Sequence, residues 1–188
     1  MDPYDEQQII ERCQEGDKDA FRGVVNRYQR LVFSVAFKMM CSEDAAKDIV
    51  QETFIRVWLN IRKYRNDKSF GTWIYTIAAR LCLDALEKSS RQQPMREYEA
   101  YLKDFVDDLT PDIILENSEL AAAIGILSQG LSPRQREVFT LVCLENMDTQ
   151  EVIDITGLTA EKIKSNLYVA RKTIKTQLKR LGYEQKGR

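Results

Sequence analysis

Leu131-Ser132-Pro133-Arg134-Gln135-Arg136-Glu137 begins the stretch of sequence that decides the fold of this chain. Thr149-Gln150-Glu151-Val152, a glycine at position 157 and a lysine-rich segment from Thr159 to Leu181 complete it. Two short helices joined by a turn that contains glycine, with a basic second helix, are the sequence pattern of a helix-turn-helix. The stretch therefore predicts a unit that binds DNA.

The second helix of this pattern has two different faces. Ile163, Ala170 and Ile174 share one face, which we expect to pack on the rest of the unit. The candidate contacts to duplex DNA are Glu161, Lys162, Lys164, Ser165, Tyr168, Arg171, Lys172 and Lys175. Residues near the start of such a helix can reach base edges, and cations further along suit phosphates. An ordinary amphipathic surface helix is the alternative interpretation of this segment alone.

Charge is strongly segregated along the 188 residues, although the net charge is only −1. Residues 61–96 contain 8 Lys and Arg against 3 Asp and Glu, and residues 160–188 contain 9 against 2. Between them, residues 97–159 contain 3 Lys and Arg against 13 Asp and Glu. Two basic segments, each beside a motif typical of DNA binding, predict two nucleic-acid contacts on one chain.

Composition argues against several function classes. The chain has no histidine, so it cannot form a Ser-His or Cys-His dyad, and it has no glycine-rich phosphate loop. We therefore expect no enzymatic activity, no small-molecule substrate and no cofactor. Cys13, Cys41, Cys82 and Cys143 are far apart, which predicts buried thiols and no metal site. The acidic start and the lack of long apolar runs predict a cytoplasmic protein without membrane insertion.

Helical periodicity dominates the sequence, and no segment alternates with period two for long enough to suggest a sheet. We predict an all-α fold with two small helical domains joined by an acidic linker. The helix-turn-helix lies in the second domain. Pro94 and Pro111 fall where the periodicity weakens, so the expected boundaries are 1–93, 94–117 and 118–188.

The first basic segment alternates cations with aromatic residues between Tyr64 and Tyr75. Phe70 and Trp73 lie within it, close to Arg65 and Lys68. Aromatic rings beside cations are the groups on which unpaired bases stack. Rings at helical spacing are also typical of a buried core, and the sequence leaves both interpretations open.

Asp48-Ile49-Val50-Gln51-Glu52-Thr53-Phe54-Ile55-Arg56-Val57-Trp58 resembles the second conserved region of bacterial extracytoplasmic-function sigma factors. Ser69-Phe70, Trp73-Ile74-Tyr75 and Asp84 extend this resemblance. Residues 131–138 and 163–171 are similar to the fourth conserved region of the same family. The order and spacing of both regions fit over nearly the whole chain, whereas a generic helix-turn-helix regulator would match only its C-terminal part.

The resemblance implies a subunit that binds core RNA polymerase, recognises promoters and initiates transcription without catalysis of its own. Docking on the largest polymerase subunit would involve Asp48, Gln51, Glu52, Phe54 and Trp58. Binding of the melted minus-ten element would involve Tyr64, Arg65, Asn66, Lys68, Phe70, Trp73, Tyr75 and Arg80. The C-terminal helix would read the double-stranded minus-thirty-five element. The resemblance also implies an anti-sigma factor that covers the DNA-binding surfaces.

The chain departs from this family at several positions. Asn166 and Val169 stand where the recognition helix of family members often carries arginine. Fewer phosphate partners predict weak DNA binding by the free chain. Two alternatives remain open: a dimeric helix-turn-helix regulator with an N-terminal sensing domain, and self-inhibition by the acidic linker folded on the basic segments.

Overall fold

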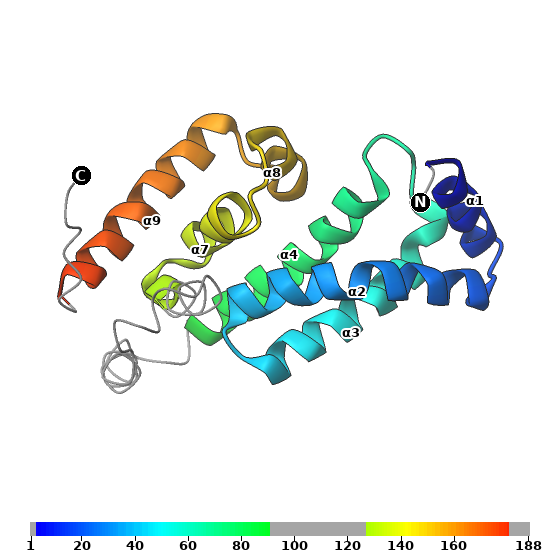
Figure 1. Ribbon diagram of the computed structural model, residues 1–188, viewed down its shortest axis with the longest axis horizontal. Coiled ribbons are helices and arrows are strands. Elements are labelled where there is room, and N and C mark those ends of the chain that lie inside the picture. Colours follow the sequence, from blue (N-terminus) through cyan, green and yellow to red (C-terminus); the bar gives the residue numbers. More distant parts are fainter. Residues whose placement is uncertain (1–2, 91–126, 181–188) are drawn as a thin grey trace, which may run out of the picture. The chain divides into compact units, whose positions relative to one another are not determined.

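The computed structural model describes residues 3–90 and 127–180, and every regular element in these ranges is a helix (Figure 1). The chain divides into two compact units, residues 1–82 with 154–156 and residues 83–153 with 157–188. The all-α fold class predicted from periodicity is thus confirmed for the described residues. The expected linker, 94–117, lies outside them.

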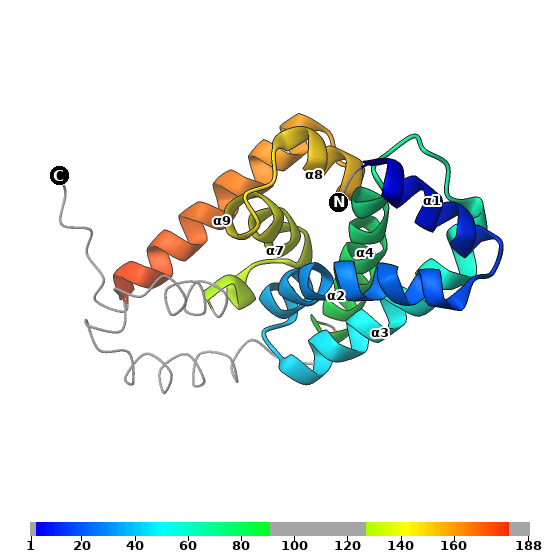
Figure 2. The same ribbon diagram turned by 45° about the vertical axis from the view of Figure 1, so that its right-hand side comes forward.

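The N-terminal unit is a set of packed helices around one apolar core. Its elements are α1 (Pro3–Gln14), α2 (Lys18–Met40), α3 (Glu43–Asn60), the short 3-10 helix η1 (Ile61–Lys63) and the start of α4 (Phe70–Ser90). α2 and α3 lie side by side, and α1 packs on α2 and η1 (Figures 1 and 2). Val32, Val57 and Ile74 are among the buried residues that join α2, α3 and α4.

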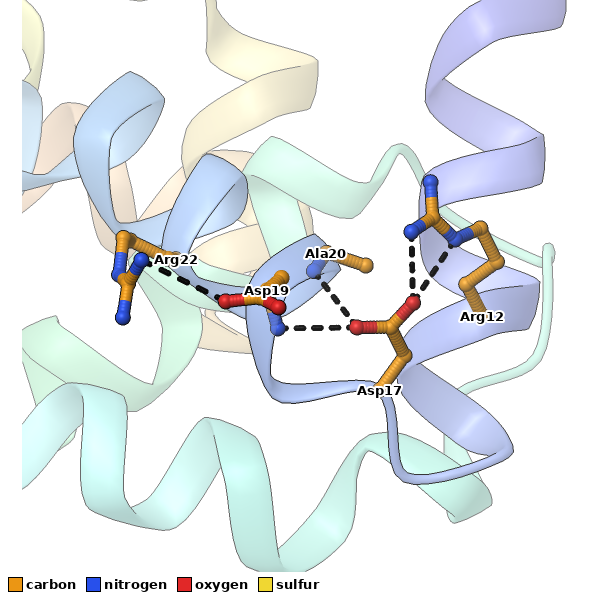
Figure 3. A network of polar contacts seen from close by, with 5 residues as sticks. All are labelled: Arg12, Asp17, Asp19, Ala20 and Arg22. Carbon is orange, nitrogen blue, oxygen red and sulfur yellow. Dashed lines mark hydrogen bonds and ion pairs between the residues drawn. The ribbon is translucent and has the colours of Figure 1, made fainter.

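Asp17 ends the turn after α1 and caps the start of α2 (Figure 3). One carboxylate oxygen accepts the backbone N–H groups of Asp19 at 2.9 Å and Ala20 at 3.0 Å. The other oxygen accepts the Arg12 guanidinium at 2.7 and 2.9 Å. The Ala20 amide, followed by Arg12, holds the pKa of Asp17 below its usual range. This single carboxylate therefore joins the end of α1 to the beginning of α2.

The junction between α2 and α3 is short because its residues suit both helix ends. Cys41 adopts a left-handed conformation with φ of 51°, and its N–H bonds the Phe37 carbonyl. Ser42 follows in extended conformation, and its hydroxyl accepts the Ala45 N–H at 3.3 Å. A capping hydroxyl followed by Glu43 and Asp44 thus begins α3 in the way that helix starts favour.

The C-terminal unit is built from shorter helices around the long last one. Its elements are η3 (Ser128–Gly130), α7 (Pro133–Phe139), the π-helical turn η4 (Thr140–Leu144), the first part of α8 (Thr149–Thr156) and α9 (Ala160–Arg180). α9 packs on α7 and η3, with Phe139, Ala170 and Ile174 in the shared core. Two capping boxes begin α7 and α8, formed by Ser132 with Gln135 and by Asp148 with Glu151.

Two charged side chains are buried in α7, and both have partners. Arg136 donates through Nε to the Ser128 carbonyl at 3.1 Å, which ties α7 to η3. Glu137 is 1% exposed and accepts Arg134 Nη1 at 2.9 Å. Burial raises the pKa of Glu137, and Arg134 opposes this shift. These bonds satisfy charges that would otherwise cost stability in the core.

Stability at acid pH provides a test of the Asp17 cap. Its pKa is lowered in the folded chain, so the cap stabilises above the unfolded pKa of about 4, and this contribution is lost as pH falls further. Replacing Asp17 with Asn should flatten this loss, because the amide keeps an acceptor but does not titrate. The measurement is urea unfolding of both proteins at a series of pH values, with Asp19→Asn as the control. Equal acid sensitivity of wild type and Asp17→Asn would contradict the assignment.

Two Gly→Ala changes should act in opposite directions. Gly157 ends α8 with φ of 69°, and an alanine there should lower the free energy of unfolding by about 1–2 kcal/mol. Gly23 lies in α2, and a Cβ added there would meet no atom from outside its own helix within 4 Å. An alanine at this position should therefore raise the free energy of unfolding by about 0.5–1 kcal/mol. Circular dichroism follows all helices, while fluorescence of Trp58 and Trp73 reports the N-terminal unit. Stabilisation by Gly157→Ala would refute the left-handed turn.

Candidate nucleic-acid and protein interfaces

α9 presents one apolar and one polar face, as its sequence predicts. Ile163, Ala170 and Ile174 are buried against the C-terminal unit. All eight residues predicted to face duplex DNA are exposed, namely Glu161, Lys162, Lys164, Ser165, Tyr168, Arg171, Lys172 and Lys175. The exposed face therefore carries cations, a hydroxyl and an aromatic ring. A major groove is wide enough to admit a helix with these groups on its surface.

The start of α9 follows the pattern of a recognition helix. Gly157 turns the chain after α8, and the Thr159 hydroxyl accepts the Lys162 N–H at 3.4 Å. A hydrogen bond from the backbone N–H of Glu161, with a further bond from Thr159, holds the pKa of the Glu161 carboxyl below its usual range. This carboxylate is an acceptor, so at a base edge it suits a cytosine amine and repels phosphate.

Two side chains with apolar surface are exposed on α9, and only one of them, Tyr168, was expected there. Tyr168 is 68% exposed and lies among the cations of the polar face. Val169 is 39% exposed beside it, where the sequence comparison with the family expected arginine. Asn166 does not compensate, because its Nδ2 donates to the Lys162 carbonyl at 2.8 Å. The face thus has fewer phosphate partners and more apolar contact area than a face carrying arginines would have.

The aromatic residues around the loop after η1 are mainly structural. Tyr64 is 9% exposed and Phe70 is 2% exposed. Their ring centroids lie 5.0 Å apart, and Phe70 also contacts Tyr28 at 5.8 Å and Trp73 at 5.6 Å. Desolvation raises the pKa of the Tyr64 phenol, whose O–H donates to the Lys68 carbonyl at 2.6 Å. The buried rings of Tyr64 and Phe70 therefore shape the loop from within, and their contact with bases stays a prediction.

The polar residues of the same loop face outward. Arg65, Asn66 and Lys68 are exposed, and so is Arg80 further along α4. Trp73 and Tyr75 are half-buried. The Ser69 hydroxyl accepts the Thr72 N–H at 3.1 Å and so begins α4 directly after the loop. The structure brings a cationic loop and partly accessible rings together in the N-terminal unit.

The predicted docking face on α3 is partly exposed. Asp48 and Gln51 are exposed, and Glu52 forms an ion pair with Arg56 at 2.7 Å. Phe54 is only 7% exposed and belongs to the core, and its role as a contact residue stays a prediction. Trp58 is half-buried, with its ring 4.9 Å from the ring of Phe21. The accessible groups among these five residues are therefore the polar ones and part of the Trp58 side chain.

An apolar groove of about 930 Å³ lies between α2 and α3, next to these polar residues. Its lining includes Ile55, which is 46% exposed, and Leu59, which is 70% exposed. Lys18 and Arg30 stand among its other lining residues. Sequence reasoning missed Ile55 and Leu59, because they lie off the buried stripe of α3. The sequence feature that could have identified them is their spacing. Both are apolar, and they lie one helical turn apart on the side of α3 opposite Val57.

The described residues show no site for a metal ion. No group of three or more Cys, Asp or Glu side chains within these ranges is arranged to hold one. All four cysteines are free thiols, two of them buried. No helix among the described ranges is long and apolar enough to cross a membrane.

Two family models match the chain in two separate ranges. The model described as Sigma-70 region 2 matches residues 24–92, and the model described as Sigma-70, region 4 matches residues 127–174. These ranges contain the α3 face, the loop after η1 and the first part of α9. The two kinds of candidate interface thus lie in two separately recognised regions of one family.

Curated relatives match over almost their entire length. The ECF RNA polymerase sigma factor SigW of Bacillus subtilis is 26% identical over 92% of this chain and 96% of its own length. The ECF RNA polymerase sigma-E factor of Haemophilus influenzae is 28% identical over 94% of this chain and 96% of its own length.

Solved structures share the fold. CnrH, solved in complex with the cytosolic domain of CnrY, aligns with a TM-score of 0.64 and 19% identity, over 91% of this chain and 95% of that chain. The sigma factor RpoE of Bartonella quintana, solved in complex with the anti-sigma factor NepR, aligns with a TM-score of 0.58 and 20% identity, over 87% and 98% of the two chains. The protein belongs to the sigma-70 family, in its extracytoplasmic-function group of alternative sigma factors.

Proposed function

We propose that this protein binds core RNA polymerase and directs it to promoters, with each unit contacting one promoter element. The observation that carries this proposal is the presence of two cationic surfaces of different kinds on units that match regions 2 and 4 of one family. An exposed helix with cations suits a duplex, and an exposed cationic loop suits unpaired strands. The sigma-70 family is not a family of catalytic enzymes, so polymerase supplies the chemistry.

The recognition of the upstream element is assigned to α9. Lys164 and Ser165 lie within its first two turns, where side chains of a helix-turn-helix reach base edges. Arg171, Lys172 and Lys175 follow on exposed positions that suit phosphates. Because Asn166 and Val169 add no cation, we infer that the free chain binds DNA weakly and that polymerase contributes much of the hold.

The recognition of the downstream element is assigned to the loop after η1 and to α4. Arg65, Asn66 and Lys68 present charge and amide groups to the strand, and Arg80 lies further along α4. Trp73 and Tyr75 offer partly accessible ring area for stacking. Capturing an unstacked base costs a few kcal/mol, which such contacts must offset.

Polymerase binding is assigned to the α3 face and the adjoining groove. Asp48 and Gln51 provide polar contacts. Ile55 and Leu59 provide exposed apolar area beside them, and contiguous area of this kind marks interaction sites on protein surfaces. Apolar area surrounded by polar groups is the usual composition of a protein interface. A dimeric regulator, the alternative from the sequence, leaves the match of the N-terminal unit to region 2 unexplained.

Regulation by an anti-sigma factor in the cytoplasm is part of the proposal. Both solved relatives described above were captured with another protein, named as an anti-sigma factor in one case. Exposed cationic faces that bind DNA are surfaces that an inhibitor must cover to block promoter binding. The test is whether an inhibitor is retained on the immobilised protein. Added core polymerase should displace it, because both partners need the same chain.

Replacing Lys164 with Ala should weaken use of the minus-thirty-five element by about 1–3 kcal/mol, because one base contact is lost. The measurement is transcription by core polymerase with the full chain, comparing promoters that have an intact or a scrambled upstream element. Lys179→Ala is the matched control, since Lys179 is also exposed but lies about four turns further along α9. An unchanged upstream dependence in Lys164→Ala would remove Lys164 from the set of reading residues.

Replacing Asp48 with Asn and Glu52 with Gln together should weaken core polymerase binding about tenfold or more, because charged contacts to the partner are lost. Retention of core polymerase on the immobilised full chain measures this. Asp84→Asn is the control, since Asp84 is an exposed carboxylate on α4 outside the proposed face. Urea unfolding should be nearly unchanged in both variants. Full retention of polymerase by the double variant would rule out this docking face.

A further inference from the structure

The C-terminal end of α1 is fixed to the beginning of the loop that follows η1. Gln14 donates through Nε2 to the Ile61 carbonyl at 3.1 Å and to the Tyr64 carbonyl at 3.4 Å. Arg62 returns a hydrogen bond from Nε to the Gln14 carbonyl at 3.0 Å. Ile10 and Cys13 of α1 are buried in the same core as Tyr64. α1 is therefore part of the support on which the loop is built.

The N-terminal half of α1 is fixed to α2 and reaches the exposed part of the loop. Glu6 accepts the Tyr28 hydroxyl at 2.5 Å and pairs with Arg27 at 3.6 Å. One residue later, Gln7 Oε1 accepts Asn66 Nδ2 at 2.7 Å. Asn66 is exposed and lies in the middle of the cationic loop. A side chain of α1 thus holds a side chain that the proposed function assigns to DNA.

A third residue determines which way the two amides point. Gln7 Nε2 donates to Glu11 Oε1 at 2.9 Å. An ionised carboxylate only accepts, so the NH₂ group of Gln7 must face Glu11 and its carbonyl must face Asn66. The carbonyl of Gln7 in turn requires the NH₂ group of Asn66. The chain of hydrogen bonds from Glu11 through Gln7 to Asn66 therefore has one polarity, which favours one orientation of the Asn66 amide over the flipped one.

This polarity matters because an amide can pair with either of two classes of base. Adenine and cytosine carry an amine next to an acceptor ring nitrogen on their pairing edge, whereas guanine and thymine carry a carbonyl oxygen next to a ring N–H. A free asparagine matches both classes by turning its amide over. With Nδ2 held by Gln7, Asn66 offers Oδ1 and its second N–H in one fixed arrangement. That arrangement matches the amine-bearing edge of adenine or cytosine.

We propose that Gln7 and Glu11 are positioning residues that orient Asn66, so that the loop selects adenine or cytosine at one unpaired position of the minus-ten element. This inference rests on the proposed function of the loop as the binding surface for melted DNA. A guanine or thymine at that position would place its carbonyl oxygen against Asn66 Oδ1 and leave both acceptors unpaired. Two acceptors that face one another without a donor between them disfavour guanine and thymine at that position.

Reversing the polarity of the relay tests the proposal. In Gln7→Lys the ammonium group only donates, so Asn66 should turn its carbonyl toward residue 7 and its NH₂ group toward the base. Core polymerase with the full chain transcribes a promoter library in which the minus-ten element is randomised. The measurement is the frequency of each base, at each randomised position, among the templates that are transcribed. Wild type should favour adenine or cytosine about tenfold at one position. Gln7→Lys should reduce or reverse that preference.

Gln8→Lys is the matched control, because Gln8 is an exposed glutamine on the same helix and the change adds the same charge. It should keep the wild-type preference. An identical base preference in Gln7→Lys and wild type would overturn the proposal, as would a wild type with no position that favours adenine or cytosine. A library from which wild type transcribes no template would overturn the proposed function itself.

A swapped pair separates positioning from a merely structural role. In the double variant Gln7→Glu, Glu11→Gln, the new amide at position 11 donates to the carboxylate at position 7, which still accepts Asn66 Nδ2. The polarity at Asn66 is retained, so the preference for adenine or cytosine should return to the wild-type value. Loss of that preference in the swapped pair, with unchanged urea unfolding, would contradict the relay.

An atomic change in the DNA provides the last check. Replacing the selected adenine with purine, or the selected cytosine with the pyrimidinone that lacks its amine, removes only the amino group. This should lower transcription by wild type about tenfold and affect Gln7→Lys much less. Equal losses in the two proteins would show that the amine is read by a residue other than Asn66.

Discussion

The packing of Phe70 against both Tyr64 and Tyr28 is the contact on which the N-terminal site depends. Ring centroids at 5.0 and 5.8 Å, with interplanar angles of 70° and 80°, place these aromatics edge to face in the core. Such burial contributes more than any hydrogen bond of the exposed loop can. With both rings turned inward at the two ends of the loop, the residues between them are left outside, and these are the polar ones. The aromatic core thereby decides which groups of the loop can meet a nucleic acid.

A comparable constraint operates in the C-terminal unit, where short helices need strong ends. Capping boxes at Ser132 and Asp148 and the left-handed Gly157 satisfy the backbone groups that helices of seven and eight residues leave open. With these ends fixed, α9 buries Ile163 and Ala170 and leaves its polar side outside. The exposed cations of α9 are consequently a result of how its apolar face is held.

The two cationic surfaces account for the two basic segments of the chain. Basic residues gather in the segments that form the loop and α9, while the α3 face carries carboxylates. A chain with nearly zero net charge can in this way bind an anionic polymer at two places and a protein at a third. α1 supports this site in two ways. Its polar residues hold the loop in one arrangement, and its apolar residues complete the core.

Local sequence signals were sufficient for the helices and for the faces of α9. The apolar spacing of Ile163, Ala170 and Ile174 depends only on helical geometry, so the exposed residues opposite them could be identified without a structure. The start at Ser42 and the turn at Gly157 follow from capping and backbone preferences of single residues. Recognition of the family from the residues around Asp48 and Leu131 was likewise possible because those motifs are contiguous in the chain.

Only the tertiary structure decided which aromatic residues are accessible and which distant side chains meet. Tyr64, Phe70 and Phe54 could equally have been surface or core, because periodicity places a ring on a face but does not say what packs against that face. The groove with Ile55 and Leu59 exists only because α2 lies beside α3. The bond between Gln7 and Asn66 joins residues 59 positions apart, and no local pattern encodes a contact of that separation. The sequence by itself determined the helices and their polar faces, and packing determined what those faces present.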